Sequence, residues 1–464
     1  MSKKVIISKE HKDSKQRTTE EKMLKKEAKE RAREVELIKR MEARNIRENW
    51  LRLDNAALIY PAIGSAEWNS VFRLCVIVAE KVNPQYLQQA LDETLVRYPF
   101  FNVSLCDGLF WHYFQVLDTK PKIEREVDYP CRPFVFNRKN QIFRVLYLDN
   151  KISFETFHSL TDGGGAIQFF NTLLVRYFEL CGTQYANLNK FNLNVRDLPS
   201  IEESEDSFRR FATKGKCKPR KESVAFAIKG PLENPNILKV VTGVVDIVEL
   251  KRIAKEFDAT INEFLSAIYL KVMIAEKRHQ NKQHKNPVKL SVPVSLRHFY
   301  PTKTMRNFSQ YINLEIPVDR EEGTFAMLLE IVKKQSKQLN KDYVQQSINT
   351  NVKSERNFFV RIMPVFIKDP VLKIVYNRVG ERLFTSTISN LGVCKLPDEL
   401  NDKILNYHFV LGATKLNRIN LTVGTFNGKC SLTFSTRLVE MRVIRDFFKT
   451  LSELGLKVEV FSNL

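Results

Sequence analysis

The chain has 464 residues and a formal net charge of +21, and none of its apolar runs reaches the roughly 18 residues of a membrane span. Its N-terminus has too short an apolar segment for a signal peptide, which argues against secretion. Its seven scattered cysteines include no Cys-x-x-Cys pair, which excludes a zinc ribbon. We expect a cytoplasmic protein whose basic excess suits an anionic ligand, a nucleic acid or an anionic membrane surface.

Residues 1–48 form a highly charged tail. They hold 16 Lys/Arg against 10 Asp/Glu, so the tail carries +6 of the net charge. The pairs Glu21/Lys25 and Glu27/Arg31 have the i,i+4 spacing that supports a solvated helix. We expect a solubilising helical or disordered extension. The alternative is a polybasic contact with RNA or with a membrane.

Residues 49–190 alternate between strand and helix patterns and predict a first α/β lobe. The predicted elements are a strand at 71–79, a helix at 83–98, a hairpin at 100–116, strands at 142–148 and 152–157, and a helix at 166–180. The regular pattern then ends, and 191–235 is predicted to be an interlobe crossover made of loops. We expect its acidic patch at 202–206 and its basic patch at 214–221 to be solvated surface.

Residues 236–464 predict a second lobe of the same kind. The predicted elements are a strand at 238–248, helices at 249–257 and 260–277, strands at 289–297 and 307–317, helices at 324–340 and 354–380, a segment with Ser-Asn-Leu-Gly at 383–393, strands at 405–412, 417–426 and 429–436, and a helix at 441–454. Thr260 and Glu263 have the spacing of a capping box at the start of their helix.

One stretch of the first lobe has the residues for acid–base chemistry. His158-Ser-Leu-Thr-Asp162-Gly163-Gly164 follows a predicted strand and precedes a predicted helix. An unperturbed histidine titrates near pH 6.5, so its neutral form can serve as a general base at cytosolic pH. The glycines allow close approach of the backbone. The motifs of P-loop NTPases, zincins, serine hydrolases and dinucleotide sites are missing, the histidines are not clustered, and no metal is expected.

With this stretch in its place, the sequence resembles the CoA-dependent acyltransferase superfamily, which includes chloramphenicol acetyltransferase, the plant BAHD acyltransferases and condensation domains. It is most similar to the alcohol-acetyltransferase-like branch. The similar stretches are Trp50-Leu-Arg-Leu-Asp-Asn-Ala-Ala, Leu95-Val-Arg-Tyr-Pro99-Phe, His158 to Gly165, Val292-Pro-Val-Ser-Leu-Arg297 with Asn307, and Ser389-Asn390-Leu-Gly392. The plant Asp-Phe-Gly-Trp-Gly motif and the second histidine of many condensation domains are missing. These departures disfavour peptide synthesis and leave acyl-CoA as the expected donor.

The resemblance implies an α/β fold of two chloramphenicol-acetyltransferase-like lobes, each a mixed sheet flanked by helices, with an active-site tunnel between them. His158 would take the proton of an alcohol or amine as it attacks the thioester in a direct transfer. Asp162 matches the family's structural carboxylate, which pairs with an arginine, and Arg297 is the expected partner with Arg144 as the competitor. Gly163, Gly164, Arg297 and Asn307 would shape the loop around the substrate. The candidates to face the oxyanion are Ser389, Asn390 and Thr387.

CoA would bring phosphate groups to the second lobe. Lys277, Arg278, Lys282 and Lys285 follow a predicted helix there, and we expect either a phosphate clamp or a merely solvated loop. No tightly bound cofactor and no nucleic acid is expected, because acyl-CoA, with acetyl as the first choice, is a co-substrate and the common RNA-module signatures are missing. Two alternatives are a non-catalytic two-lobed binding protein and a protein that binds nucleic acid or membrane through its basic tail.

Overall fold

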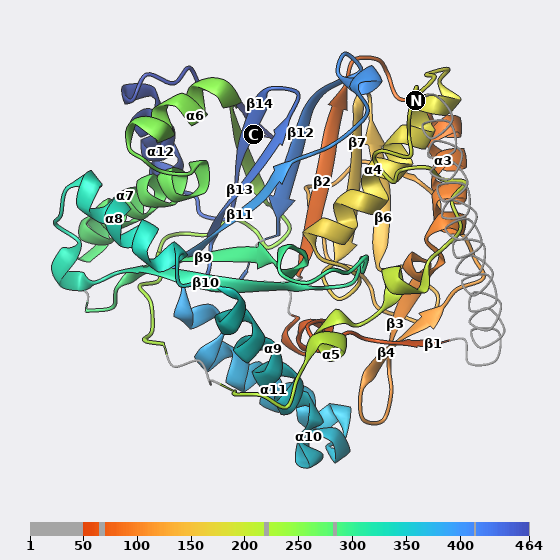
Figure 1. The fold of residues 1–464 in the computed structure, drawn as a ribbon, viewed down its shortest axis with the longest axis horizontal. Helices are drawn as coiled ribbons and strands as arrows, with labels where there is room; N and C mark the ends of the chain where they lie inside the picture. Colours follow the sequence, from red (N-terminus) through yellow and green to blue (C-terminus); the bar gives the residue numbers. More distant parts are fainter. Residues whose placement is uncertain (1–49, 65–69, 218–221, 282–284, 413, 464) are drawn as a thin grey trace, which may run out of the picture.

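The computed structural model describes residues 50–64, 70–217, 222–281, 285–412 and 414–463, so the charged tail at 1–48 lies outside the described residues. Two lobes lie side by side, each built on its own β-sheet with helices packed against it (Figure 1). Each lobe has a separate apolar core. Across the described residues, no helix combines the length and apolarity that crossing a membrane requires.

A five-stranded sheet forms the N-terminal lobe. Its strands, in spatial order, are β12 (Ile404–Leu411), β2 (Val71–Val78), β7 (Lys151–Phe157), β6 (Phe143–Leu148) and β5 (Glu124–Arg125). The helices α3 (Pro84–Arg97) and α4 (Gly163–Leu180) pack against it, and a second sheet has the order β1 (Trp50–Arg52), β4 (His112–Val116), β3 (Val103–Asp107). Because β12 comes from the C-terminal half of the chain, each half contributes to this lobe.

A seven-stranded sheet forms the C-terminal lobe. Its strands, in spatial order, are β10 (Ser309–Ile316), β9 (Val288–Ser295), β11 (Ser386–Val393), β13 (Ile419–Phe426), β14 (Lys429–Thr436), β8 (Lys239–Asp246) and β15 (Glu459–Ser462). The helices of its core are α6 (Ile247–Glu256), α7 (Ile261–Asn281), α8 (Phe325–Ser336) and α12 (Arg442–Glu453). The predicted capping box opens α7, since the Glu263 N–H donates to Thr260 Oγ1 at 3.2 Å and the Thr260 N–H donates to Glu263 Oε2 at 2.9 Å.

Further helices surround the junction of the lobes. They are α2 (Tyr60–Ile63), α5 (Ser207–Phe211), α9 (Lys341–Arg356), α10 (Phe358–Ile362) and α11 (Val365–Val379). The short 3-10 helices are Ala57–Ile59, Pro99–Phe101, Ile201–Ser204, Leu296–His298, Val318–Arg320, Glu381–Leu383 and Asp398–Leu400. The helical region predicted at 354–380 is present but is divided among the end of α9, α10 and α11, and the prediction missed most of α9. Asn357 ends α9 and caps α10 with its side chain, and Pro364 separates α10 from α11.

The crossover at 191–235 also differs from its prediction. Its acidic patch is not simply solvated surface, because Glu203 is buried and accepts two hydrogen bonds of 2.6 Å from the guanidinium of Arg97. Asp206 caps α5 by accepting from the backbone N–H of Arg209. The partner of Glu203 lies 106 residues upstream, so the local charge pattern could not reveal this contact. The basic patch continues into 218–221, outside the described residues.

Candidate active site

His158 lies directly after β7, where the chain leaves the N-terminal sheet. Its backbone N–H donates to the carbonyl of Ser70 at 2.8 Å. Its ring stacks on Tyr60, with ring centroids 4.6 Å apart, and meets Phe72 edge-on at 5.0 Å. Burial lowers the pKa of His158 below its ordinary value, although the negative charge of Asp162 acts in the opposite direction. The half-buried imidazole is therefore neutral at neutral pH.

Asn307 determines which nitrogen of His158 carries the proton. The Asn307 Nδ2 donates to Asp54 Oδ2 at 3.2 Å and to the carbonyl of Ser159 at 3.3 Å. Because both partners are acceptors, the amide oxygen of Asn307 must be the atom that faces His158 Nδ1, at 3.1 Å. Nδ1 consequently donates a proton, and Nε2 keeps its lone pair. This is the tautomer that a general base acting through Nε2 requires.

The support of Asn307 extends to a buried carboxylate at the start of the N-terminal lobe. Asp54 is 1% exposed and accepts from Ala57 N at 2.8 Å and from Arg306 Nε at 3.3 Å. Arg306 also donates to the carbonyl of Arg52 at 3.0 Å and is itself buried. The order Asp54–Asn307–His158 thus joins the first described segment, the loop before β10 and the end of β7.

Asp162 points away from this chain of contacts and pairs with Arg297. The guanidinium of Arg297 donates to both carboxylate oxygens, at 2.8 and 3.0 Å. The backbone N–H groups of Gly165 and Phe308 donate to the same carboxylate, at 3.1 and 2.8 Å. Burial would raise the pKa of Asp162, but the charge of Arg297 and these hydrogen bonds hold it below its ordinary value. Asp162 therefore caps α4 and fastens it to the start of β10.

The three glycines after Asp162 differ in how much space they have. A Cβ on Gly163 would lie 2.8 Å from Leu391 Cδ2, and one on Gly164 would lie 3.0 Å from Arg297 Nη1. A Cβ on Gly165 would lie 2.0 Å from the carbonyl oxygen of Met305, a backbone atom that cannot rotate away. The sequence prediction singled out the first two glycines, whereas the third has the strictest steric requirement.

The segment with the oxyanion candidates lies against the other side of the glycines, because Leu391 of β11 approaches Gly163. Side chains alternate along a strand, and Ile388 belongs to the core beneath α7 and α12. Thr387 and Ser389 therefore share the opposite face of the sheet, away from those helices. Asn390 Oδ1 accepts from the Gly392 N–H at 2.7 Å in a local turn. The oxyanion role stays a prediction, with Thr387 and Ser389 on one face.

No family model matches the chain, and no curated protein matches it by sequence. Solved structures do match. Polyketide synthase associated protein 5 from Mycobacterium tuberculosis matches at 14% identity and a TM-score of 0.57, and the match covers 86% of this chain and 96% of that protein. A trichothecene 15-O-acetyltransferase from Fusarium sporotrichioides matches at 10% identity and a TM-score of 0.57, and the match covers 87% of this chain and 93% of that enzyme.

A variant of the starter condensation domain of rhizomide synthetase, solved in complex with C8-CoA, matches over 89% of this chain and 96% of that domain, at 14% identity and a TM-score of 0.54. The chain has the fold of these structures, which include an acetyltransferase and a condensation domain. The predicted fold class, two α/β lobes with mixed sheets, is thereby confirmed. The tunnel between the lobes stays a prediction.

Lys277 does not suit the phosphate clamp predicted for the C-terminal lobe. Its side chain is 2% exposed, and its Nζ donates to both carboxylate oxygens of Glu321 at 2.7 and 2.8 Å. A buried ammonium already paired in this way cannot reach a phosphate without leaving Glu321 buried and unpaired. Arg278 donates to the Glu321 carbonyl at 2.6 Å but remains 40% exposed, and Lys285 is exposed. Lys282 lies outside the described residues.

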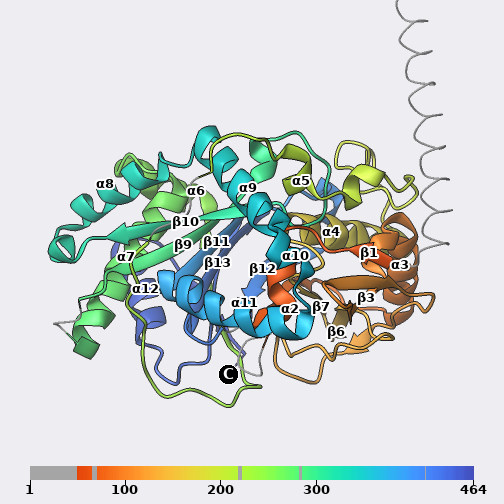
Figure 2. The ribbon, with the colours of Figure 1, turned by 90° about the horizontal axis from the view of Figure 1, so that it is seen from below.

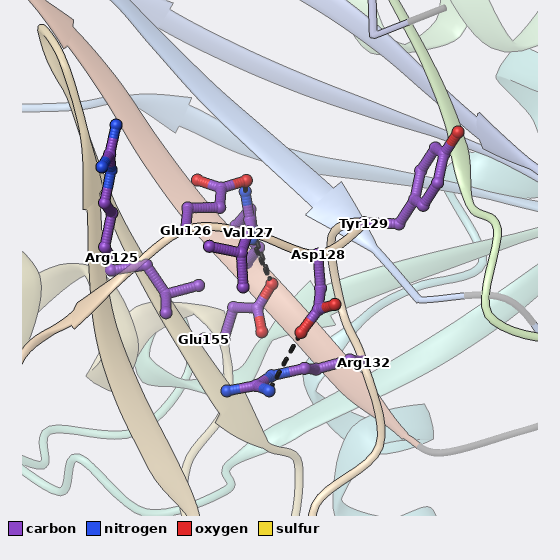
Figure 3. Close-up of a pocket in the computed structure, with 9 residues that line it drawn as sticks. Arg125, Glu126, Val127, Asp128, Tyr129, Arg132 and Glu155 are labelled. Carbon is purple, nitrogen blue, oxygen red and sulfur yellow. Dashed lines mark hydrogen bonds and ion pairs between the residues drawn. The ribbon is translucent and has the colours of Figure 1, made fainter.

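Arg144, the competing partner of Asp162, belongs to another cluster. It donates to Glu155 at 2.6 Å, and Glu155 also accepts from Arg73 at 2.7 Å. A small pocket opens beside these residues, where Arg132 pairs with Asp128 at 3.0 Å (Figure 3). Its charged groups neutralise one another, and neither His158 nor Asp162 lines it. Within the described ranges, no group of three or more His, Cys, Asp or Glu side chains is arranged to hold a metal ion.

Sequence reasoning assigned no role to three residues that contact the site. Tyr60 stacks on His158, Asp54 holds Asn307, and Arg306 pairs with Asp54. Some indication for Asp54 was present in the sequence, because it lies in Trp50-Leu-Arg-Leu-Asp-Asn-Ala-Ala, one of the stretches that resemble the acyltransferase superfamily. Tyr60 and Arg306 carry no pattern in the linear sequence, because each acquires its neighbours only when segments far apart in the chain meet.

Proposed function

We propose that the chain is an acyltransferase that moves an acyl group, acetyl as the first choice, from CoA to an alcohol or amine. The observation that carries the proposal is the Asp54–Asn307–His158 chain of contacts, which leaves a neutral imidazole with its Nε2 lone pair free of these contacts. A metabolite-sized acceptor and acyl-CoA would meet at His158 in the tunnel between the lobes. The acyltransferases and condensation domains that share the fold support the general reaction.

In the proposed reaction, the acceptor hydroxyl or amine attacks the thioester carbonyl while His158 Nε2 takes its proton. The carbonyl oxygen of the intermediate becomes an oxyanion, and a hydrogen-bond donor aimed at it contributes about 3 kcal/mol. Thr387 and Ser389 are the side chains we propose for that role. When the C–S bond breaks, the CoA thiolate leaves and receives the proton from His158. Asp162 takes no part in the proton transfer, because its carboxylate is occupied by Arg297 and two backbone N–H groups.

The phosphates of CoA would have to reach basic side chains on the C-terminal lobe. Arg278 and Lys285 are the exposed members of the predicted set within the described residues, so we propose them for this contact in place of Lys277. Replacing both by glutamine should raise the KM for acyl-CoA and leave the KM for the acceptor unchanged.

The deciding experiment offers acetyl-CoA and longer acyl-CoA esters together with a panel of alcohols and amines, and follows release of the free CoA thiol. His158→Ala should lower turnover by about 10²–10⁴-fold, the usual contribution of a general base, while the variant still folds and unfolds cooperatively. His279→Ala is the matched control, because His279 is exposed on α7. Turnover of His158→Ala equal to that of the control would refute the mechanism. Acyl-CoA binding without any transfer would favour the non-catalytic alternative.

A further inference from the structure

The helices α10 and α11 leave an extended apolar surface uncovered. Phe358, Phe359 and Phe366 are 67%, 72% and 73% exposed. The large apolar side chains of this segment that are exposed are Phe358, Phe359, Ile362, Phe366, Ile367, Val371, Ile374 and Val375, which we call the α10–α11 surface. Contiguous exposed apolar side chains of this kind mark an interaction site, since soluble proteins rarely leave them uncovered. α10 lies at the outer edge of the molecule (Figure 1).

The hairpin between β3 and β4 extends this surface. Leu109 and Phe110 at its tip are 68% and 42% exposed. The tip is fastened to α11, because the Val365 N–H donates to the Leu109 carbonyl at 2.9 Å and the Lys368 ammonium donates to the Phe110 carbonyl at 2.5 Å. His112, at the base of the hairpin, contacts Asp369 of α11 at 3.0 Å. Two segments whose contacting residues lie 258 positions apart in the sequence thus present one apolar face.

Basic side chains predominate around the α10–α11 surface. Lys353, Arg356, Arg361 and Arg378 are exposed. Among the acidic residues nearby, Glu355 is buried against Arg209, while Asp369 and the exposed Asp107 of the hairpin both contact His112. Apolar side chains bordered by exposed Lys and Arg are what binds the surface of an anionic membrane. A second copy of the chain is a poorer match, because a symmetric contact would bring these cations close to one another.

The same helices lead to the candidate active site. α11 packs along α2 (Figure 2), and Lys373 Nζ of α11 donates to the carbonyl of Gly64, directly after α2, at 3.3 Å. The first residue of α2 is Tyr60, whose ring stacks on His158. Only one layer of helix therefore separates the α10–α11 surface from the ring that covers His158.

We infer that the α10–α11 surface docks on an anionic lipid membrane, and that the acceptor is a lipophilic alcohol or amine dissolved in it. The statement about the acceptor rests on the proposed function, whereas the docking does not. Phe358, Phe359 and Phe366 enter the interface between headgroups and acyl chains, and the four cations contact lipid phosphates. The acceptor then reaches His158 from the lipid side, past α11 and α2.

Vesicle flotation of the full chain tests the docking, with vesicles of phosphatidylcholine alone or of phosphatidylcholine with phosphatidylglycerol. The chain should float with the anionic vesicles and much less with the neutral ones. The triple variant Phe358→Ser, Phe359→Ser, Phe366→Ser should bind the anionic vesicles at least about tenfold more weakly. The variant Arg356→Gln, Arg361→Gln should lose roughly fivefold per charge at low salt. Leu198→Ser, Val248→Ser is the matched control and should bind as the parent does, since both side chains are exposed elsewhere.

Two outcomes would overturn the docking. Undiminished flotation of the triple Phe variant would place the contact elsewhere, for example in residues 1–48. A dimer that the triple variant dissociates, with no flotation of the parent, would show that a second copy covers the surface. Thiol release with a short, water-soluble alcohol should be unaffected in the triple variant, while transfer to a long-chain alcohol in vesicles should fall with flotation. The His158→Ala variant should still float with the anionic vesicles although its turnover is lost. The flotation assay therefore tests the docking independently of the proposed reaction.

Discussion

The contact between Asp162 and Arg297 offers the sharpest test of how the site is held together. Asp162→Ala removes the acceptor of hydrogen bonds from Gly165, Phe308 and both terminal nitrogens of Arg297. It leaves a guanidinium that is 20% exposed without its counter-charge. Removing one partner of a buried ion pair costs about 3–5 kcal/mol, and the loss of a helix N-cap costs about 1 kcal/mol. Because Arg297 keeps some contact with water, we expect the free energy of unfolding to fall by about 4 kcal/mol.

The assay is a double-mutant cycle of Asp162→Ala, Arg297→Ala and the double variant, followed by chemical denaturation and by turnover. The double variant should lose less stability than the two single losses combined, by about 1–3 kcal/mol, because the residues contact each other. Turnover should fall in each variant together with stability, since the pair holds Phe308 and therefore the adjacent Asn307. Lys277→Ala, which removes a buried ion pair far from the glycines in the sequence, is the control for stability loss alone.

One result would refute this reasoning. If Asp162→Ala unfolded like the parent while turnover collapsed, Asp162 would act on His158 in the chemistry and would not be a structural brace. The pH profile gives an independent check. The negative charge of Asp162 raises the pKa of His158, so its removal should move the acid limb of activity to lower pH or leave it in place. An acid limb at higher pH would contradict the same account.

Two further predictions concern the neighbours of this pair. Asn307→Ala should lower kcat about two- to tenfold, the value of one hydrogen bond, because His158 Nδ1 loses the acceptor that selects its tautomer. Asn307→Asp should instead raise the pKa of His158 by adding a negative charge, and the acid limb of kcat/KM should shift upward from below pH 6.5. Equal pH profiles for the two variants would count against the contact with His158. Gly165→Ala should cost about 1–3 kcal/mol or more in denaturation, because its Cβ would lie 2.0 Å from the Met305 carbonyl. Gly163→Ala is the milder comparison, since only the end of the Leu391 side chain must move, and equal stability of the two would contradict the steric argument.

Local patterns in the sequence were sufficient for most of the secondary structure and for locating the stretch that contains the candidate base, His158. A β-branched run predicted β2, the Asn83-Pro84 start predicted α3, and the Thr260/Glu263 spacing predicted the cap of α7. These features depend on contacts within a few residues. The stretch from His158 to Gly165 could also be identified because its residue types and their place between a strand and a helix are both readable along the chain.

The helices between the lobes were predicted less well. α10 and α11 carry apolar residues on exposed faces, so their periodicity does not match the pattern of a helix packed on one core. The prediction that the acidic patch of the crossover is solvated was wrong for a different reason. Arg97, the partner of Glu203, is supplied by α3 of the first lobe. Lys277 looked like a surface cation in a basic segment and is a buried one, because Glu321 follows 44 residues later.

The sequence by itself determined that a strand ends in His158 and that a carboxylate and three glycines follow, since these are local properties of the backbone and of residue type. The tertiary structure alone decided which partners these residues have. It brings Asn307 and Asp54 to His158 across 149 and 253 residues of chain, and Arg297 to Asp162 across 135. It also places β12 in the N-terminal sheet and an apolar, basic surface one helix away from Tyr60. Such contacts depend on how the two lobes pack together. The number of residues between two positions does not indicate whether they meet in space.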